Sequence, residues 1–309
     1  MLALTSATGK LGSAVLNALL DNNLIDAKEL VVCTSSEPTA SKFAALRSKN
    51  ITVRYNNFDE PASLEAAYAG CDNLFLVSSP RISMDFDDAP LWEGREAHHL
   101  AAIDAARKVG VKHIYYTSLA FGNPSKASVM RAHIRTEAYL KGLEDVQWTI
   151  IREGLYNESW PLYLGYYYGL KNETRTEVVV AGDGPISWTS ILDLAFGTAR
   201  ILTDPPEQWA GRTFYLSQNK TSNLKDIAQI VSKEKGEEVA LKIVARKEYE
   251  DFYVNELGME RPAVEWWSST YDALQDGECD IKDPTLEDIL KKAGRELIPV
   301  EETIAKMLQ

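Results

Sequence analysis

The first half of the chain alternates short apolar runs with amphipathic helical patterns, and this alternation restricts the fold more than any other feature. Continuous apolar strands separated by amphipathic helices indicate a parallel sheet that is covered on both faces. We therefore predict an α/β, doubly wound fold whose ligands bind at the carboxyl ends of the strands. The strands are predicted at residues 2–5, 30–33, 51–53, 73–77, 113–118 and 148–151, and the clearest helices at 11–20 and 92–109.

A glycine-containing turn joins the first predicted strand to the first helix at residues 5–12, which read TSATGKLG. A backbone that approaches a pyrophosphate needs glycine at close contacts, and the first turn of the helix offers free N–H groups to the anion. Gly9 and Gly12 meet this need, whereas Ser6 stands where the usual fingerprint has its first glycine. The turn predicts a Rossmann-type dinucleotide site with contacts from Ser6, Thr8, Gly9, Lys10, Leu11 and Gly12.

The second half of the chain has a different pattern, with many aromatic residues at 155–168 and mainly helical periodicity toward the C-terminus. We predict a Rossmann domain at residues 1–155 and a smaller, mainly helical substrate lobe at 156–309, from which a segment at about 185–220 returns to the Rossmann sheet. The aromatic residues suit either a flat acceptor or an ordinary interface between lobes. They are Tyr156, Trp160, Tyr163, Tyr166, Tyr167 and Tyr168.

Charge and composition argue against several kinds of partner. The 309-residue chain has a formal net charge of −12 and no basic stripe, so a nucleic acid or an anionic membrane surface would repel it. No apolar run approaches the roughly 20 residues that span a bilayer, and the N-terminus does not resemble a secretory signal. Cys33, Cys71 and Cys279 have no paired spacing, which indicates reduced thiols and no metal site. We expect a cytoplasmic monomer or homodimer that binds a small molecule.

Several segments in the same order resemble the NmrA-like group of atypical short-chain dehydrogenases, in particular its quinone- and dye-reducing branch. They are SATGKLG, FDEPASLEAAYAGCDNLFLVSSP, ARKVGVKHIYYTSLAF, AHIRTEAYL, TIIREGLYNESW and STYDALQDGE, and together they extend over nearly the full chain. The resemblance implies an NAD(P)H-dependent oxidoreductase that transfers a hydride to a quinone or similar conjugated electrophile. The alternative is a regulator of the same group, which binds the dinucleotide without catalysis and reports redox state to a protein partner.

The residues after the second strand favour NADP(H) over NAD(H), although NAD(H) stays open. An acidic residue here would bond the ribose hydroxyls of NAD, but Thr34 and Ser35 occupy this place. The resembling reductases usually have an arginine where Thr34 stands, so Lys10 and Lys42 are the expected cations for a 2′-phosphate.

Cofactor contacts are also expected after the third and fourth strands. The resemblance places Phe58 and Asp59 beside the adenine, although Asp59 is equally consistent with an acid at the start of a helix. The end of the fourth strand is the topological place for the ribose and pyrophosphate. The expected contacts there are Ser78, Ser79 and Pro80.

The catalytic residues are less defined by the sequence. Ser118 ends the fifth strand, where short-chain dehydrogenases keep a serine, but no Tyr-xxx-Lys pair follows it. The resemblance puts His133 where other branches have a lysine facing the nicotinamide, so it is expected to contact the cofactor and to assist protonation of a reduced quinone. Its alternative is a histidine that only packs on its helix. Tyr156 is expected to line the substrate pocket, with a buried interface tyrosine as the alternative.

Overall fold

The computed structural model describes residues 1–167 and 169–309, so Tyr168 of the aromatic segment lies outside the described residues. Its centre is a seven-stranded parallel sheet with strand order β10-β6-β5-β4-β1-β2-β3. The order reverses between β1 and β4, which is the switch point of a doubly wound sheet. The predicted Rossmann-type α/β fold is therefore confirmed. The strands are β1 (Leu2–Leu4), β2 (Leu30–Thr34), β3 (Thr52–Tyr55), β4 (Asn73–Leu76), β5 (His113–Leu119), β6 (Gln147–Glu153) and β10 (Arg212–Leu216).

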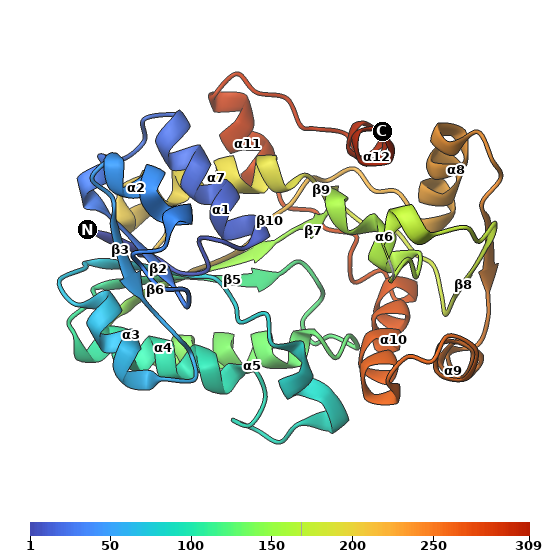
Figure 1. Ribbon diagram of the computed structural model, residues 1–309, viewed down its shortest axis with the longest axis horizontal. Coiled ribbons are helices and arrows are strands. Elements are labelled where there is room, and N and C mark those ends of the chain that lie inside the picture. The colour runs from blue at the N-terminus through green and yellow to red at the C-terminus, as the bar shows by residue number, and fades with distance from the viewer. Residues whose placement is uncertain (168) are drawn as a thin grey trace.

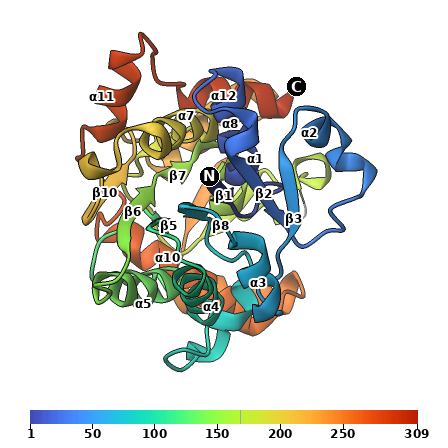
Figure 2. The same cartoon turned by 90° about the vertical axis from the view of Figure 1, so that its left-hand side faces the viewer.

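Helices cover both faces of this sheet (Figure 1). On one face α1 (Lys10–Asp21) packs against α7 (Ile191–Thr203), and on the other lie α3 (Pro61–Tyr68), α4 (Glu96–Lys108) and α5 (Met130–Lys141). The view along the sheet shows the same two layers (Figure 2). All residues of β1 and β2 are buried, because a parallel sheet is screened from water on both sides. A short helix, α2 (Ala44–Ser48), precedes the edge strand β3.

The remaining elements form a second lobe beside the carboxyl ends of the strands, at the right of Figure 1. Its core contains the buried Trp160, Tyr163 and Tyr166, so these three aromatic residues pack in the lobe interior. The helices of this part are α6 (Trp160–Tyr163), α8 (Leu224–Lys235), α9 (Arg246–Asp251), α10 (Arg261–Gln275) and α12 (Val300–Leu308), while α11 (Thr285–Lys292) packs on α7. No helix among the described residues is long and apolar enough to cross a bilayer.

Two small parallel sheets lie outside the main one. The first pairs β7 (Leu155–Tyr156) with β9 (Trp188–Thr189), and the second pairs β8 (Glu177–Val180) with β11 (Ala240–Ile243). The alternation of Val239, Leu241 and Ile243 in the sequence predicts β11, but β8 was not predicted. The partner of β8 is distant in sequence, so no local turn signal marks their pairing.

Helix α4 begins at Glu96, four residues later than the predicted start at residue 92. Trp92 has a φ of 70°, and its N–H donates to the Glu96 carboxylate over 3.0 Å. The N–H of Arg95 donates to Asp85 Oδ1 over 2.8 Å. These side-chain acceptors satisfy backbone N–H donors just before the helix. Residues 92–95 therefore form a non-helical turn, and the regular helix begins only at Glu96.

Candidate functional site

A cavity of about 480 Å³ lies at the carboxyl ends of β1 to β4, the edge where a doubly wound sheet binds its ligand. Most of the predicted contacts line this cavity: Ser6, Thr8, Gly9, Lys10, Leu11, Gly12, Thr34, Ser35, Phe58, Asp59, Ser78, Ser79, Pro80 and Tyr156. Lys42, Ser118 and His133 are not among its lining residues. Other lining residues were not predicted, namely Cys33, Asn56, Asn57, Val77, Arg81, Arg95 and His98.

The turn between β1 and α1 forms one wall of the cavity. An added Cβ on Gly12 would lie 2.3 Å from the carbonyl oxygen of Ser6, so only glycine fits where the helix meets the turn. Ser6 itself has a φ of 52°, the left-handed conformation that glycine adopts most easily. The N–H groups of Leu11 and Gly12 have no acceptor among the described residues, and the first turn of α1 contains no acid. This end of the helix therefore suits an anion.

The turn after β2 carries the candidate site for a 2′-phosphate. Thr34 Oγ1 accepts a hydrogen bond from the N–H of Ser36 over 3.1 Å, which tightens the turn. Lys42 Nζ donates to Ser36 Oγ over 2.7 Å. Lys42 itself does not line the cavity. Its ammonium group lies against the turn after β2, whose residues Thr34 and Ser35 do line it.

Asp59 and Arg81 form an ion pair at the cavity. Arg81 Nη1 donates to Asp59 Oδ1 over 2.6 Å, and the guanidinium lowers the pKa of this carboxyl. His98 Nε2 lies 3.3 Å from the same oxygen, and its ring stacks on Phe58 with 5.5 Å between centroids. Asp59 does not cap α3. The N-cap residue of this helix is Glu60, and no side chain caps the helix with a hydrogen bond.

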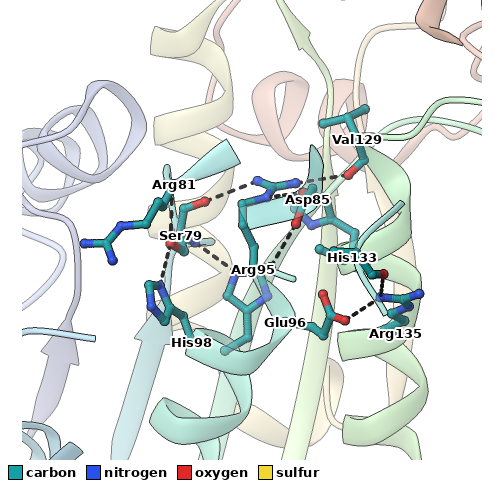
Figure 3. A network of polar contacts seen from close by, with 12 residues as sticks. Ser79, Arg81, Asp85, Arg95, Glu96, His98, Val129, His133 and Arg135 are labelled. Atoms are coloured by element: carbon teal, nitrogen blue, oxygen red, sulfur yellow. Dashed lines mark hydrogen bonds and ion pairs between the residues drawn. The ribbon is translucent and has the colours of Figure 1, made fainter. Parts of the chain in front are cut away.

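Arg95 connects three segments around the cavity (Figure 3). Its Nε donates to Asp85 Oδ2 over 2.6 Å, its Nη1 to the carbonyl oxygen of Ser79 over 3.2 Å and its Nη2 to that of Val129 over 3.1 Å. The side chains of Arg95 and Asp85 are only 5% and 2% exposed. The pair is therefore a buried ion pair that holds the end of β4, the following loop and the start of α5 together. Arg95 lies inside the helix predicted at residues 92–109, and an arginine in that place carries no sequence signal for this role.

His133 and Ser118 lie in the interior, away from the lining of the cavity. His133 is 1% exposed, and its Nδ1 lies 2.9 Å from the hydroxyl of Tyr116. Burial, and then the charge of Arg95, lower its pKa well below the usual range, so the imidazole is neutral at neutral pH. Ser118 Oγ donates to Glu137 Oε1 over 2.7 Å. A buried, neutral His133 is what the alternative of a packing histidine expects. Its catalytic contribution stays a prediction.

Tyr156 is the lining residue that follows β6, and a buried carboxyl lies close to it in sequence. Burial raises the pKa of the Tyr156 phenol, so this group stays protonated at neutral pH. Glu153 is 1% exposed, and its Oε1 accepts a hydrogen bond from Thr198 over 2.9 Å. Its Oε2 has no partner among the described residues, and burial raises the pKa of this carboxyl to about 8.

We predict that Glu153 makes the protein less stable as pH rises from about 5 to 8. Its folded pKa of about 8 exceeds the ordinary glutamate value of 4.5, so the folded state retains a proton that the unfolded state releases in this window. The wild type should therefore lose on the order of 3 kcal/mol of unfolding free energy between pH 5 and pH 8 through this group. Glu153→Gln has no such proton to lose, so this part of the pH dependence should be absent in the variant. Urea titrations at both pH values measure the difference. Parallel pH dependence of the two proteins would contradict the prediction.

Comparison with known proteins agrees with the geometry of this cavity. A protein-family model described as NAD(P)H-binding matches residues 6–181, which begin at the turn after β1. The chain belongs to this NAD(P)H-binding family. It is 30% identical to the NmrA-like family domain-containing oxidoreductase flvB of Aspergillus flavus, over 99% of this chain and 94% of that protein. The resemblance to the NmrA-like group is thereby confirmed, and the chain has the fold of an NAD(P)H-dependent oxidoreductase.

Two further relatives of this NmrA-like chain are reductases. Quinone oxidoreductase 2 of Escherichia coli is 28% identical over 81% of this chain and 79% of its own length. The crystal structure of Citrobacter sp. triphenylmethane reductase complexed with NADP(H) superposes with a TM-score of 0.79 at 27% identity, covering 99% of this chain and 100% of that one. The NmrA-like chain is thus related to quinone and dye reductases over most of its length. Among the described residues no group of three or more His, Cys, Asp or Glu side chains is placed to bind a metal.

Proposed function

We propose that this NmrA-like protein transfers a hydride from NADPH to a quinone or a similar conjugated electrophile. The observation that carries the proposal is the cavity at the switch point, where the glycine turn, the free N–H groups of α1 and the turn after β2 meet. When bound, NADPH supplies the hydride, and the quinone takes up this hydride and one proton to leave as a hydroquinone. The relatives named as quinone and triphenylmethane reductases support this class of acceptor.

Each wall of the cavity has a role in this proposal. The N–H groups of Leu11 and Gly12 bind the pyrophosphate, and Lys10 adds positive charge at the same helix end. Ser78, Ser79 and Pro80 position the ribose, while Phe58 and Asp59 lie beside the adenine. Tyr156 forms the wall against the acceptor. Hydride transfer depends mainly on such positioning, so the missing Tyr-xxx-Lys pair is compatible with turnover.

The proposed function is tested by NADPH oxidation with a panel of quinones and cationic and neutral dyes. We expect turnover with at least one quinone, and no oxidation of NADPH when the acceptor is left out. A protein that binds NADPH tightly but reduces none of these acceptors would contradict the enzymatic proposal. It would favour the alternative of a dinucleotide-binding regulator, which needs only the cofactor cavity.

Lys42 is predicted to select NADPH over NADH. Its ammonium lies on Ser36, beside the acid-free turn after β2, where a 2′-phosphate would gain a charge-assisted contact. Lys42→Ala should raise the Kd for NADPH by about 10-fold and leave the Kd for NADH unchanged. Calorimetry with both cofactors measures this, and Lys49→Ala, a change of an exposed lysine at the end of α2, is the matched control. Equal weakening of both cofactors would remove Lys42 from the specificity.

His133 is predicted to support turnover as well as packing. A reduced quinone oxygen must gain a proton or a hydrogen bond, but it is already a fairly stable anion. His133→Ala and His133→Gln should therefore lower kcat by only about 10-fold, below the usual range for a general acid. Melting curves identify any loss of folded protein, and kinetics per folded molecule give the catalytic effect. Full activity of both folded variants would leave His133 with a packing role alone.

A further inference from the structure

A series of buried groups leads from the cofactor cavity to His133. The N–H of Ser79, a lining residue, donates to His99 Nε2 over 2.9 Å. On the other side of the same ring, His99 Nδ1 lies 2.8 Å from Thr136 Oγ1 and 3.2 Å from the Tyr116 hydroxyl. The Tyr116 hydroxyl in turn lies 2.9 Å from His133 Nδ1. All five residues are at most 2% exposed, so no bulk water competes for these bonds.

The backbone donor at Ser79 determines where His99 carries its proton. A backbone N–H can only donate, so His99 Nε2 must be the unprotonated acceptor. The neutral ring then has its proton on Nδ1, and it donates toward Thr136 and Tyr116. Thr136 accepts this bond, because its own hydroxyl donates to the carbonyl oxygen of Ala132 over 2.8 Å. His99 is thereby held in one tautomer.

The same reasoning continues through Tyr116. Its hydroxyl lies 3.2 Å from His99 Nδ1, which already carries a proton, and 2.9 Å from His133 Nδ1, and Thr136 also lies beside it. Thr136 Oγ1 already accepts from His99, so we assign the Tyr116 proton to the close contact with His133 Nδ1, which leaves the His133 proton on Nε2. No hydrogen bond joins this Nε2 to a described residue, and it is not among the fully buried polar atoms that lack a partner. A donor N–H without a protein acceptor is free to serve a ligand.

We propose that His99 and Tyr116 are positioning residues, which hold His133 as a neutral donor whose Nε2–H serves an oxygen of the bound dinucleotide or of the acceptor. The inference rests on the proposed function, because the bound dinucleotide and the acceptor supply the oxygen that accepts a hydrogen bond from His133 Nε2–H. It also connects the cavity with the donor, since the first bond of the series starts at the Ser79 backbone. Burial, and then the positive charge of Arg95, oppose protonation of His133, which keeps the ring a donor at one nitrogen only.

Nitrogen-15 NMR of histidine-labelled protein tests the series directly, because it distinguishes the two neutral tautomers. The chain has only four histidines, so each resonance can be assigned by single substitutions. We expect His99 as the Nδ1–H tautomer and His133 as the Nε2–H tautomer in the free protein at neutral pH. His113 is an internal reference for the Nε2–H form, since its Nε2 bonds Thr149, whose hydroxyl donates to Trp209. An Nδ1–H tautomer at His133 would overturn the proposal.

Tyr116→Phe removes the donor to His133 and tests the positioning role. We expect His133 to populate both tautomers and kcat with a quinone to fall by about 10-fold, the effect of losing one hydrogen bond in the transition state, with KM for NADPH within about twofold of wild type. Tyr115→Phe is the matched control, because Tyr115 is buried beside it on β5 but its hydroxyl has no partner among the described residues. It should change neither quantity.

Unchanged kcat in a folded Tyr116→Phe variant with mixed His133 tautomers would overturn the positioning role. If Tyr116→Phe does not fold, the spectrum of the wild-type protein alone still tests the tautomer assigned to His133. Failure of the proposed function is distinguishable, because it would abolish turnover in the wild type while the tautomers of the free protein stay as described. In that case saturating NADP⁺ replaces kinetics as the readout: a shift of His133 Nε2 supports its contact with a ligand, and no shift overturns it.

Discussion

Gly12→Ala is expected to raise the Kd for NADPH by about 100-fold or more, the largest effect on binding that we predict. The added methyl would lie 2.3 Å from the carbonyl oxygen and 2.8 Å from the carbonyl carbon of Ser6. Both are backbone atoms, so no side chain can rotate away, and the turn must separate from α1. The free N–H groups at the start of the helix would then no longer face the pyrophosphate.

Two glycine variants provide the comparison for this prediction. Gly9→Ala brings its Cβ to 3.2 Å from the same oxygen, so a smaller loss of affinity is expected. Gly142→Ala, at the end of α5, has 3.5 Å to its nearest neighbour and a helical backbone, so it should bind NADPH as the wild type does. Calorimetry on each folded protein gives the three dissociation constants. Wild-type affinity in a folded Gly12→Ala protein would show that the turn does not hold the cofactor.

Arg95→Met is expected to lower the free energy of unfolding by about 3–5 kcal/mol, the largest effect on stability. The substitution leaves the Asp85 carboxylate 2% exposed without its cation, and it removes donors to the carbonyl oxygens of Ser79 and Val129. An uncompensated buried charge is the main cost. Because Ser79 and Arg95 both line the cavity, NADPH affinity should also fall, by about 10-fold. Chemical denaturation and calorimetry measure the two effects.

Arg81→Met is the matched control for Arg95→Met. The Arg81–Asp59 pair also has two close N–O contacts, but its side chains are 51% and 41% exposed, so its loss should leave the free energy of unfolding nearly unchanged. A double variant, Arg95→Met with Asp85→Leu, removes both buried charges and should recover much of the lost stability without recovering NADPH affinity. A loss below about 1 kcal/mol for Arg95→Met would mean that the buried pair does not hold the three segments together.

The sequence alone determined the sheet and the edge at which the cavity lies. The buried strands read as apolar runs because both faces are covered, and the glycine turn is local, so neither depends on distant contacts. The same local logic predicted six lining residues of this turn, namely Ser6, Thr8, Gly9, Lys10, Leu11 and Gly12. It could not show that Ser6 takes the left-handed conformation in place of a glycine, because that conformation is imposed by the close approach of α1 to the turn.

Only the tertiary structure decided which side chains surround the cavity from helix α4. His98 and His99 are adjacent on α4, and adjacent helical residues usually point to different faces, yet His98 Nδ1 lies 3.1 Å from Ser79 Oγ and His99 Nε2 lies 2.9 Å from the Ser79 nitrogen. Arg95 bonds the Ser79 carbonyl from the same helix start. These contacts depend on how α4 packs against the end of β4. A sequence pattern cannot predict this packing, because Ser79 and its partners on α4 are many residues apart in the chain.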